Sequence, residues 1–306
     1  GMNSVFQLAK KRGYVTWFGE EFCTTDSPWV VQGNFFSMDE VDFQFHRLYC
    51  RMVAAGADGT VAKDSWQITA GACLAGQYRY GMPLQVIKKL WESYPDAPKL
   101  AFASSLPAHY YTRKWDEVAV DAEAMDAPLS EFLGDMLARP DMDNTLVVLR
   151  SDHGMQQGGQ TEDYSTQVEQ KRPFTYVISP RKWVSPTGKG EDALSINADR
   201  LVTGFDLHRS LARVILGGAS TAGKAGPVTV PSAAPWAIDV LDSVVPVERT
   251  CAQARVPIDF CACVNEYVHV DGLKGDVGSP HAPRAGVCNF LTENKRFCVA
   301  PEGVSG

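Results

Sequence analysis

The chain has no long hydrophobic run and no excess of basic residues. None of its apolar segments approaches the roughly 18 residues that a membrane-spanning helix needs, so we expect no membrane span. Lys and Arg number 29 against 36 Asp and Glu, which gives a formal net charge of −7, and the basic residues are dispersed. Because nucleic-acid-binding surfaces are clustered and basic, we expect no nucleic-acid partner.

Several motifs of common protein classes are also missing. No C-x2-C pair is followed by a second such pair, which excludes the spacing of zinc ribbons and fingers. The Gly-rich segment 217–223 lacks the G-K-[ST] ending of a phosphate-binding loop. The first residues do not have the basic and then apolar pattern of a secretory signal. Internal repeats and low-complexity tracts are absent too.

Cysteine, by contrast, is present in an even number and is unevenly placed. Five of the 8 cysteines lie within residues 251–298, where helical and strand periodicity is weakest. This clustering favours disulfides in a loop-rich tail and an extracellular or secretory location. Free buried thiols in a cytosolic protein are the alternative. A zinc site made of these cysteines together with His269 and His281 is conceivable, but the irregular spacing of the residues favours disulfides. The cysteines are Cys23, Cys50, Cys73, Cys251, Cys261, Cys263, Cys288 and Cys298.

Apolar strands alternate with amphipathic helices along the chain. This order predicts an α/β fold with a mostly parallel sheet and helices on both faces. Residues 217–235 are rich in Gly, Ala, Ser and Pro, so we predict an α/β domain over 1–220 and a Cys-rich extension over 221–306. The expected helices are 3–12, 37–56, 83–94, 115–138 and 206–216, and the expected strands lie at 14–19, 95–104, 145–149 and 172–179.

The most informative stretch is the end of the strand 145–149, which runs into Ser151, Asp152, His153 and Gly154. In an open α/β sheet, ligands gather beyond the carboxyl ends of the strands. A carboxylate and an imidazole there offer one oxygen and one nitrogen ligand to a divalent metal ion. We expect the glycine to let the backbone turn tightly away. An Asp-His turn that only caps the next element is the alternative.

Further motifs stand in order around this stretch. A helix carrying Asp126 leads into the D-N-T segment 143–145 and then S-D-H-G at 151–154. Residues 165–180 are similar to a T-x-x-x-E-x-x-x-P segment, and 206–211 (DLHRSL) to a D-L-x-x-T-L helix. The ordered series resembles the alkaline phosphatase/sulfatase superfamily.

A narrower resemblance is carried by three other segments. Residues 12–22 (RGYVTWFGEEF), the region around Cys73 and residues 249–263 (RTCAQARVPIDFCAC) look like the sulfatase-like extracellular proteins of animals and protists. The resemblance therefore implies an α/β fold of the alkaline phosphatase/sulfatase type with a Cys-rich carboxyl-terminal extension.

The resemblance also implies roles for single residues. Asp152 and His153 match metal ligands, so we expect one divalent ion (Ca, Mn, Mg or Zn), or two ions if the metal is Zn. His109 matches a catalytic histidine that contacts the transferred group, although a packed loop residue is the alternative. Tyr110 stands where relatives often carry Asp, which argues against a second metal site. Asp126 matches an acid that positions its helix.

The strand that carries the nucleophile in the superfamily has no counterpart among these residues. Segment 23–26 (CTTD) also follows a strand, but it does not match C-x-P-x-R, and we expect Cys23 to form a disulfide. By ancestry we expect a metal-dependent hydrolase or transferase of sulfate or phosphate esters, and a chain that is inactive without that segment is the alternative. The substrate would be a small anionic ester or a glycan or lipid ester. A non-catalytic extracellular binding protein with the same fold is the competing hypothesis.

Overall fold

The structure is a computed structural model that describes residues 4–21, 38–45, 48–50, 73–74, 77–105, 123–154, 164–187, 190–218, 234–257 and 260–262. Helices and a small parallel sheet of three strands are present, which is compatible with the predicted α/β class. The chain divides into two compact units. The first holds Gly1–Thr145 and Leu211–Ala233, and the second holds Leu146–Ser210 and Ala234–Gly306. The predicted division at residue 220 stays a prediction.

A parallel sheet of three strands, in the order β2-β1-β5, forms the centre of the first unit. Its middle strand β1 (Val15–Glu20) pairs in parallel with β2 (Phe43–Gln44) and β5 (Lys99–Ser104). All residues of β1 after Val15 are buried, as expected for a central parallel strand covered on both faces. The strands predicted at 14–19 and 95–104 are thus confirmed as parallel neighbours.

The helix predicted over 37–56 is wrong in its first half. A 3-10 turn, η1 (Met38–Glu40), and the strand β2 stand there, and within the described part of this range a helix is present only at 48–50. Hydrogen bonds of Asp42 explain the difference. Asp42 Oδ2 accepts from the backbone N–H of Thr16 at 2.9 Å and from the hydroxyl of Thr16 at 2.8 Å. These bonds attach the segment to β1, and such tertiary contacts override a helical spacing of apolar residues.

Helix α1 (Val5–Lys11) packs on β1 through its buried side. It begins at Ser4, whose Oγ accepts from the N–H of Gln7 at 3.0 Å and so satisfies one of the free donors of the first turn. Phe6 meets Phe18 of β1 edge to face, with ring centroids 6.1 Å apart. A second cluster joins Leu8 and Ala9 of α1 to Ala212 and Ile215.

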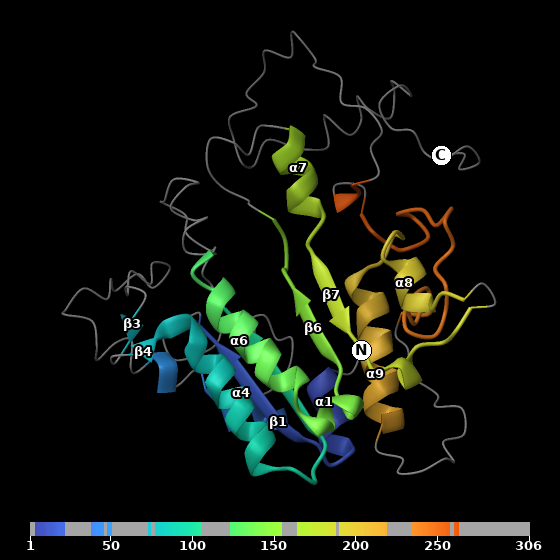
Figure 1. Cartoon of the computed structure of the whole chain (residues 1–306). Helices are drawn as coiled ribbons and strands as arrows, with labels where there is room; N and C mark the ends of the chain where they lie inside the picture. Colours follow the sequence, from blue (N-terminus) through green and yellow to red (C-terminus); the bar gives the residue numbers. More distant parts are fainter. Residues whose placement is uncertain are drawn as a thin grey trace, which may run out of the picture. The chain divides into compact units, whose positions relative to one another are not determined.

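Helices α4 (Met82–Ser93) and α6 (Asp126–Leu137) lie side by side in the first unit (Figure 1). Lys88 of α4 forms an ion pair with Asp135 of α6. The helix predicted at 83–94 is confirmed. Of the helix predicted over 115–138, residues 115–122 lie outside the described residues, Glu123 is helical, and α6 begins at Asp126 after a short turn. Other elements in the described part of this unit are β3 (Cys73–Leu74) paired antiparallel with β4 (Gln77–Tyr78), and the turns η2 (Arg79–Gly81) and η3 (Pro140–Asn144).

In the second unit, β6 (Val147–Arg150) and β7 (Thr175–Ile178) form an antiparallel pair (Figure 1), with Val147 opposite Ile178. Both strands were predicted, but the expectation of a mostly parallel sheet does not hold for this pair. Helix α7 (Tyr164–Lys171) precedes β7. The sequence predicted only a polar stretch there, because this helix has too few apolar residues to display a helical period.

Two further helices complete the described part of the second unit. Helix α8 (Ala193–Asn197) is capped by Asp192, whose Oδ1 accepts from the N–H of Ser195 at 2.7 Å. This hydrogen bond to the backbone lowers the pKa of the Asp192 carboxyl. Helix α9 (Gly204–Gly218) confirms the prediction for 206–216, and its residues from Leu211 onward belong to the first unit. A turn, η4 (Arg181–Trp183), follows β7.

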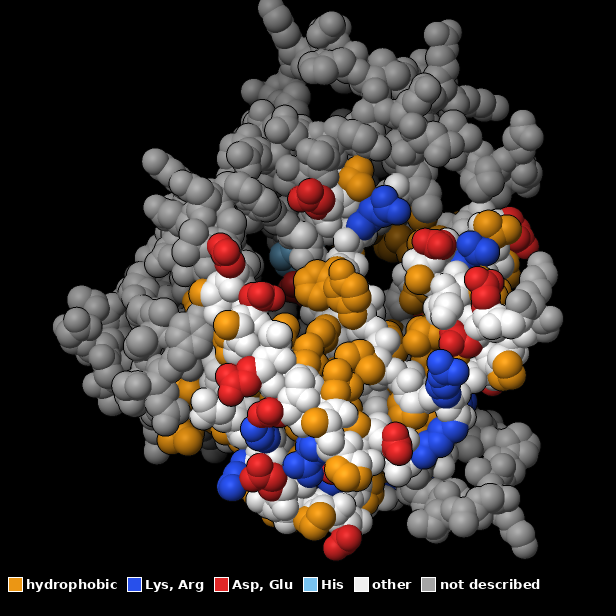
Figure 2. Space-filling model, viewed as in Figure 1, with side chains coloured by type: hydrophobic (Ala, Val, Ile, Leu, Met, Phe, Trp, Pro, Cys, Tyr) orange, Lys and Arg blue, Asp and Glu red, His pale blue; other side chains and the backbone are white. Residues whose placement is uncertain are grey.

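On the face drawn in Figure 2, acidic and basic side chains of the described residues are interspersed rather than sorted by sign. Local pairs result, such as Arg139 with Asp141, whose Nε and Oδ1 are 3.0 Å apart. Separately, the helices in the described parts of the chain include none long and apolar enough to cross a membrane.

Candidate functional site

The S-D-H-G turn directly follows β6, where the sequence predicted it. The N–H of His153 donates to Asp152 Oδ1 at 2.9 Å, which fixes the carboxylate against its own turn. The other oxygen, Oδ2, lies 3.3 Å from His153 Nε2. The Asp152 side chain is 79% exposed and that of His153 is 33% exposed, so both groups can be reached from solvent.

A second contact determines which nitrogen of His153 carries the proton. Nδ1 lies 2.7 Å from the carbonyl oxygen of Gly154. Because a carbonyl can only accept, the neutral ring places its proton on Nδ1 and keeps a lone pair on Nε2. Nε2 and Asp152 Oδ2 then face each other as two acceptors. A cation between them favours this arrangement, and that cation is either a second proton on the ring, which gives a His–Asp ion pair, or a metal ion.

The spacing of the two acceptors fits a metal ion. Neighbouring ligands of a tetrahedral zinc ion, each about 2.1 Å from the metal, lie roughly 3.4 Å apart, close to the observed 3.3 Å between Nε2 and Oδ2. The donor set of one imidazole nitrogen and one carboxylate oxygen suits Zn or Mn. A group of three or more His, Cys, Asp or Glu side chains able to hold a metal is not found among the described residues, and the role of Asp152 and His153 as metal ligands stays a prediction.

Of the other predicted site residues, only Asp126 is among the residues that the structure describes. His109, Tyr110 and the segment 23–26 lie outside the described residues. Asp126 is the first residue of α6, where a negative charge is favoured by the helix dipole, and its expected positioning role stays a prediction. The structure therefore brings Asp152 together with His153 and leaves the position of the predicted catalytic histidine open.

Two buried acids in the first unit were not predicted as site residues. Glu20 ends β1 with 4% of its surface exposed, and Glu21, which follows, is fully buried. Ser105, just beyond β5, donates its hydroxyl to Glu21 Oε2 at 2.9 Å. These groups stand at the carboxyl ends of neighbouring parallel strands, where ligands bind in open α/β sheets. Two consecutive acids after an apolar strand were the sequence signal that could have identified them.

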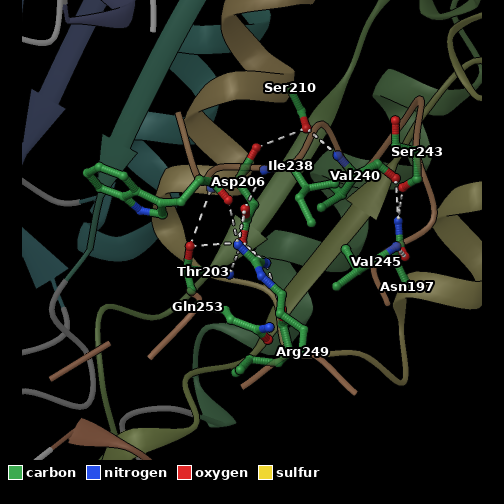
Figure 3. Close-up of polar contacts among 12 residues, drawn as sticks. Asn197, Thr203, Asp206, Ser210, Ile238, Val240, Ser243, Val245, Arg249 and Gln253 are labelled. Atoms are coloured by element: carbon green, nitrogen blue, oxygen red, sulfur yellow. Dashed lines mark hydrogen bonds and ion pairs between the residues drawn. The ribbon is translucent and has the colours of Figure 1, made fainter. Parts of the chain in front are cut away.

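A third polar cluster, within the second unit, is structural. Asp206 of α9 faces Arg249 (Figure 3), and its carboxylate also accepts from the N–H groups of Ile238 and Thr203, both at 2.7 Å. Arg249 in turn donates to the carbonyls of Leu201 and Trp236. Because both carboxylate oxygens are already engaged, this network anchors the segment after residue 234 and offers no site to a ligand.

Ser210 and Asn197 extend this anchoring. Ser210 Oγ accepts from the N–H of Val240 at 2.9 Å, and Asn197 Oδ1 accepts from that of Val245 at 2.7 Å (Figure 3). The motif residues Asp206 and Ser210 of the D-L-x-x-T-L resemblance are therefore explained by tertiary hydrogen bonds.

Part of the cysteine prediction is confirmed. Cys251 and Cys261 form a disulfide, and Cys50 is disulfide-bonded as well. This chemistry is compatible with an oxidising compartment. The suggested mixed site falls outside the described residues, because His269, His281 and Cys288 are not among them.

Comparison with known proteins adds one match. A family model described as "Protein of unknown function (DUF229)" matches residues 1–272. No curated protein matches the chain.

Proposed function

Since the chain belongs to the DUF229 family, we propose that it is a divalent-metal-binding protein of the alkaline phosphatase/sulfatase type that acts on sulfate or phosphate esters. The observation that carries the proposal is the pair of facing acceptors, Asp152 Oδ2 and His153 Nε2, 3.3 Å apart at the end of β6. The ordered motifs around this pair, from Asp126 to Ser210, support the same ancestry.

Asp152 and His153 would hold the ion in this proposal. When bound, a divalent ion would polarise the non-bridging oxygens of an ester and lower the pKa of a nucleophile. Asp152 contributes the negative charge, and its exposed position leaves room for an anionic ester to approach. His153 contributes a neutral nitrogen, oriented by its hydrogen bond to the carbonyl of Gly154.

The remaining parts of the proposal rest on sequence resemblance. His109 would neutralise charge that develops on the transferred group. The substrate would be a small anionic ester, or a glycan or lipid ester, met in the secretory pathway or outside the cell. The disulfide between Cys251 and Cys261 supports that location.

Metal binding by the purified chain tests the proposal. We expect isothermal titration with Zn²⁺, Mn²⁺, Ca²⁺ and Mg²⁺ to detect at least one bound ion, with the affinity falling more than about 10-fold in Asp152→Ala. Because the ion binds the folded protein, a concentration of 100 times the Kd should stabilise the fold by about 2.7 kcal/mol. Asp199→Ala, at another exposed aspartate of the second unit, is the matched control and should bind like the unaltered chain.

A chain that binds none of the four ions, or an Asp152→Ala variant that binds them with unaltered affinity, would contradict the metal site. Hydrolysis of para-nitrophenyl sulfate and phosphate, measured with the tightest-binding ion present, separates the two ester classes. Metal binding without hydrolysis of either ester would favour the competing hypothesis of a non-catalytic binding protein.

A further inference from the structure

The backbone of Glu169 and Gln170 lies so close to Gly154 that a side chain at this position would clash with it. A Cβ at this position would stand 2.5 Å from the carbonyl oxygen of Glu169, 2.6 Å from its carbonyl carbon and 2.9 Å from the nitrogen of Gln170. These atoms belong to the backbone of the last turn of α7. Among the described glycines, only Gly13 and Gly190 have a positive φ. The chain bends at Gly154 as expected, and the close approach of two backbones is a second reason for a glycine there.

The same glycine orients the His153 ring. Its carbonyl oxygen accepts from His153 Nδ1 at 2.7 Å, and its N–H donates to the carbonyl of Gln170 at 3.4 Å. A short chain of hydrogen bonds therefore links the end of α7, through the two peptide groups of Gly154, to His153 Nδ1. This bond orients the ring so that Nε2 faces Asp152.

Ser151 attaches the other end of the turn. Its N–H donates to the carbonyl of Phe174 at 3.1 Å, and its hydroxyl oxygen accepts from the N–H of Phe174 at 3.1 Å. The side chain of Ser151 thus takes the place of a backbone carbonyl and extends the β6–β7 ladder by one residue. With both ends attached, Asp152 and His153 have little freedom to separate.

We propose that the segment 169–174, formed by the end of α7 and the start of β7, positions the Asp152–His153 pair for a cation, with Ser151 and Gly154 as the positioning residues. This inference rests on the proposed metal-binding function. Groups that orient metal ligands affect affinity about 10–100-fold when altered, because a ligand held at the wrong angle loses its bond to the ion.

Gly154→Ala in the full chain tests the link to α7. Its added methyl group must displace either the turn or the helix end, so we expect Co²⁺ to bind about 10–100-fold more weakly and the d–d absorption band of bound Co²⁺ to shift. In the metal-free protein, ¹⁵N NMR should find the Nδ1–H tautomer of neutral His153 in the unaltered chain and a mixture of tautomers in the variant. Gly204→Ala is the control, because a Cβ there would meet only the end of the Arg150 side chain at 3.5 Å.

Ser151→Ala provides an independent variant, should Gly154→Ala not fold. It removes the acceptor of the Phe174 N–H and should weaken Co²⁺ binding by about 10-fold. Ser179→Ala, which removes a hydroxyl bonded to the carbonyl of Pro180, should leave Co²⁺ binding unchanged.

Unaltered Co²⁺ affinity and an unaltered spectrum in folded Gly154→Ala and Ser151→Ala, together with loss of binding in Asp152→Ala, would overturn the positioning role alone. Absence of binding of Co²⁺ and of all four ions Zn²⁺, Mn²⁺, Ca²⁺ and Mg²⁺ in the unaltered chain would instead overturn the proposed function on which the role rests.

Discussion

Arg249 and Asp206 form a two-point ion pair in the interior of the second unit. Arg249 Nη1 lies 2.8 Å from Asp206 Oδ2, and Nη2 lies 3.0 Å from Oδ1. At most 4% of either side chain is exposed. Such a pair adds little by itself compared with apolar residues of the same size, but breaking it leaves a buried charge without its partner. The pair therefore makes the attachment of the segment after residue 234 sensitive to single substitutions.

Arg249→Met should lower the free energy of unfolding by about 3–5 kcal/mol, because the Asp206 carboxylate stays buried opposite an apolar chain. Urea unfolding followed by circular dichroism measures the change. Lys89→Met, which breaks the surface pair with Glu92, is the control and should have little effect. A loss in Arg249→Met no larger than in the control would show that the buried pair does not anchor this segment.

Arg255 has a backbone conformation that normally favours glycine. Its φ is +56°, and the N–H of Val256 donates to the carbonyl of Cys251 at 2.8 Å, as in a helix-terminating motif. The guanidinium carbon lies 5.7 Å from the centre of the Trp236 ring. The stacking of Arg255 on Trp236 thus accompanies a left-handed backbone that costs an L residue about 1 kcal/mol.

Two substitutions separate these effects. Arg255→Ala keeps the left-handed backbone and loses the stacking, so its unfolding free energy should fall by about 0.5–1 kcal/mol. Arg255→Gly loses the stacking but relieves the backbone, so it should be more stable than Arg255→Ala by about 1 kcal/mol. Thermal unfolding of both variants measures the difference. Equal stability of the two would refute the left-handed backbone at this position.

The disulfide between Cys251 and Cys261 should contribute measurably to stability. It spans a sequence separation of 10, and closing a loop of that length in the unfolded chain stabilises the folded state by roughly 2–3 kcal/mol. We expect a variant with both cysteines changed to Ser to lose about that amount, and a non-reducing digest of the unaltered chain to yield the linked peptide. Eight reactive thiols in the denatured, unreduced protein would reject both this disulfide and the extracellular location.

The lowered pKa of Asp192 predicts a pH dependence. The ionised carboxylate accepts the N–H of Ser195 in the folded state, so its stabilising effect is present above the pKa of an unfolded aspartate, about 3.9. The effect is lost as the pH falls through the lowered folded pKa. Asp192→Ala should therefore be clearly less stable than the unaltered chain at pH 7, and the difference should shrink towards pH 3.

Asp192→Asn separates the cap from its charge, because asparagine caps a helix comparably and does not titrate. Urea unfolding at the two pH values should give the same difference between Asp192→Asn and Asp192→Ala. If the unaltered chain and Asp192→Ala differ equally at both values, the carboxylate does not cap α8 in its ionised form.

The sequence predicted most elements whose signal is local. Helices α1, α4 and α9 have apolar residues at helical spacing, and strands β1, β5 and β7 are apolar runs bounded by turn residues. Helix α7 was missed because it is polar. Segment 38–44 was assigned to a helix because the bond of Asp42 to Thr16, 26 residues away, is invisible to any local pattern.

Some features of the candidate site are likewise visible in the sequence, and others depend on contacts between distant segments. The adjacency of Asp152 and His153 is covalent, so the sequence alone places a carboxylate and an imidazole side by side after a strand. The buried acids Glu20 and Glu21 were overlooked because their burial depends on β5 and on Ser105, distant in the chain. The sequence suggested only the turn at Gly154, because the close approach of the Glu169 backbone cannot be read from a turn motif.

What the sequence by itself determined is the α/β class, the position of the S-D-H-G turn and the residue types available to a cation. Only the tertiary structure decided that β6 and β7 run antiparallel, that His153 Nε2 faces Asp152 Oδ2, and that Asp206 forms an ion pair with Arg249. Composition and periodicity act between near neighbours, whereas hydrogen-bond partners and close backbone approach are determined when distant segments pack together.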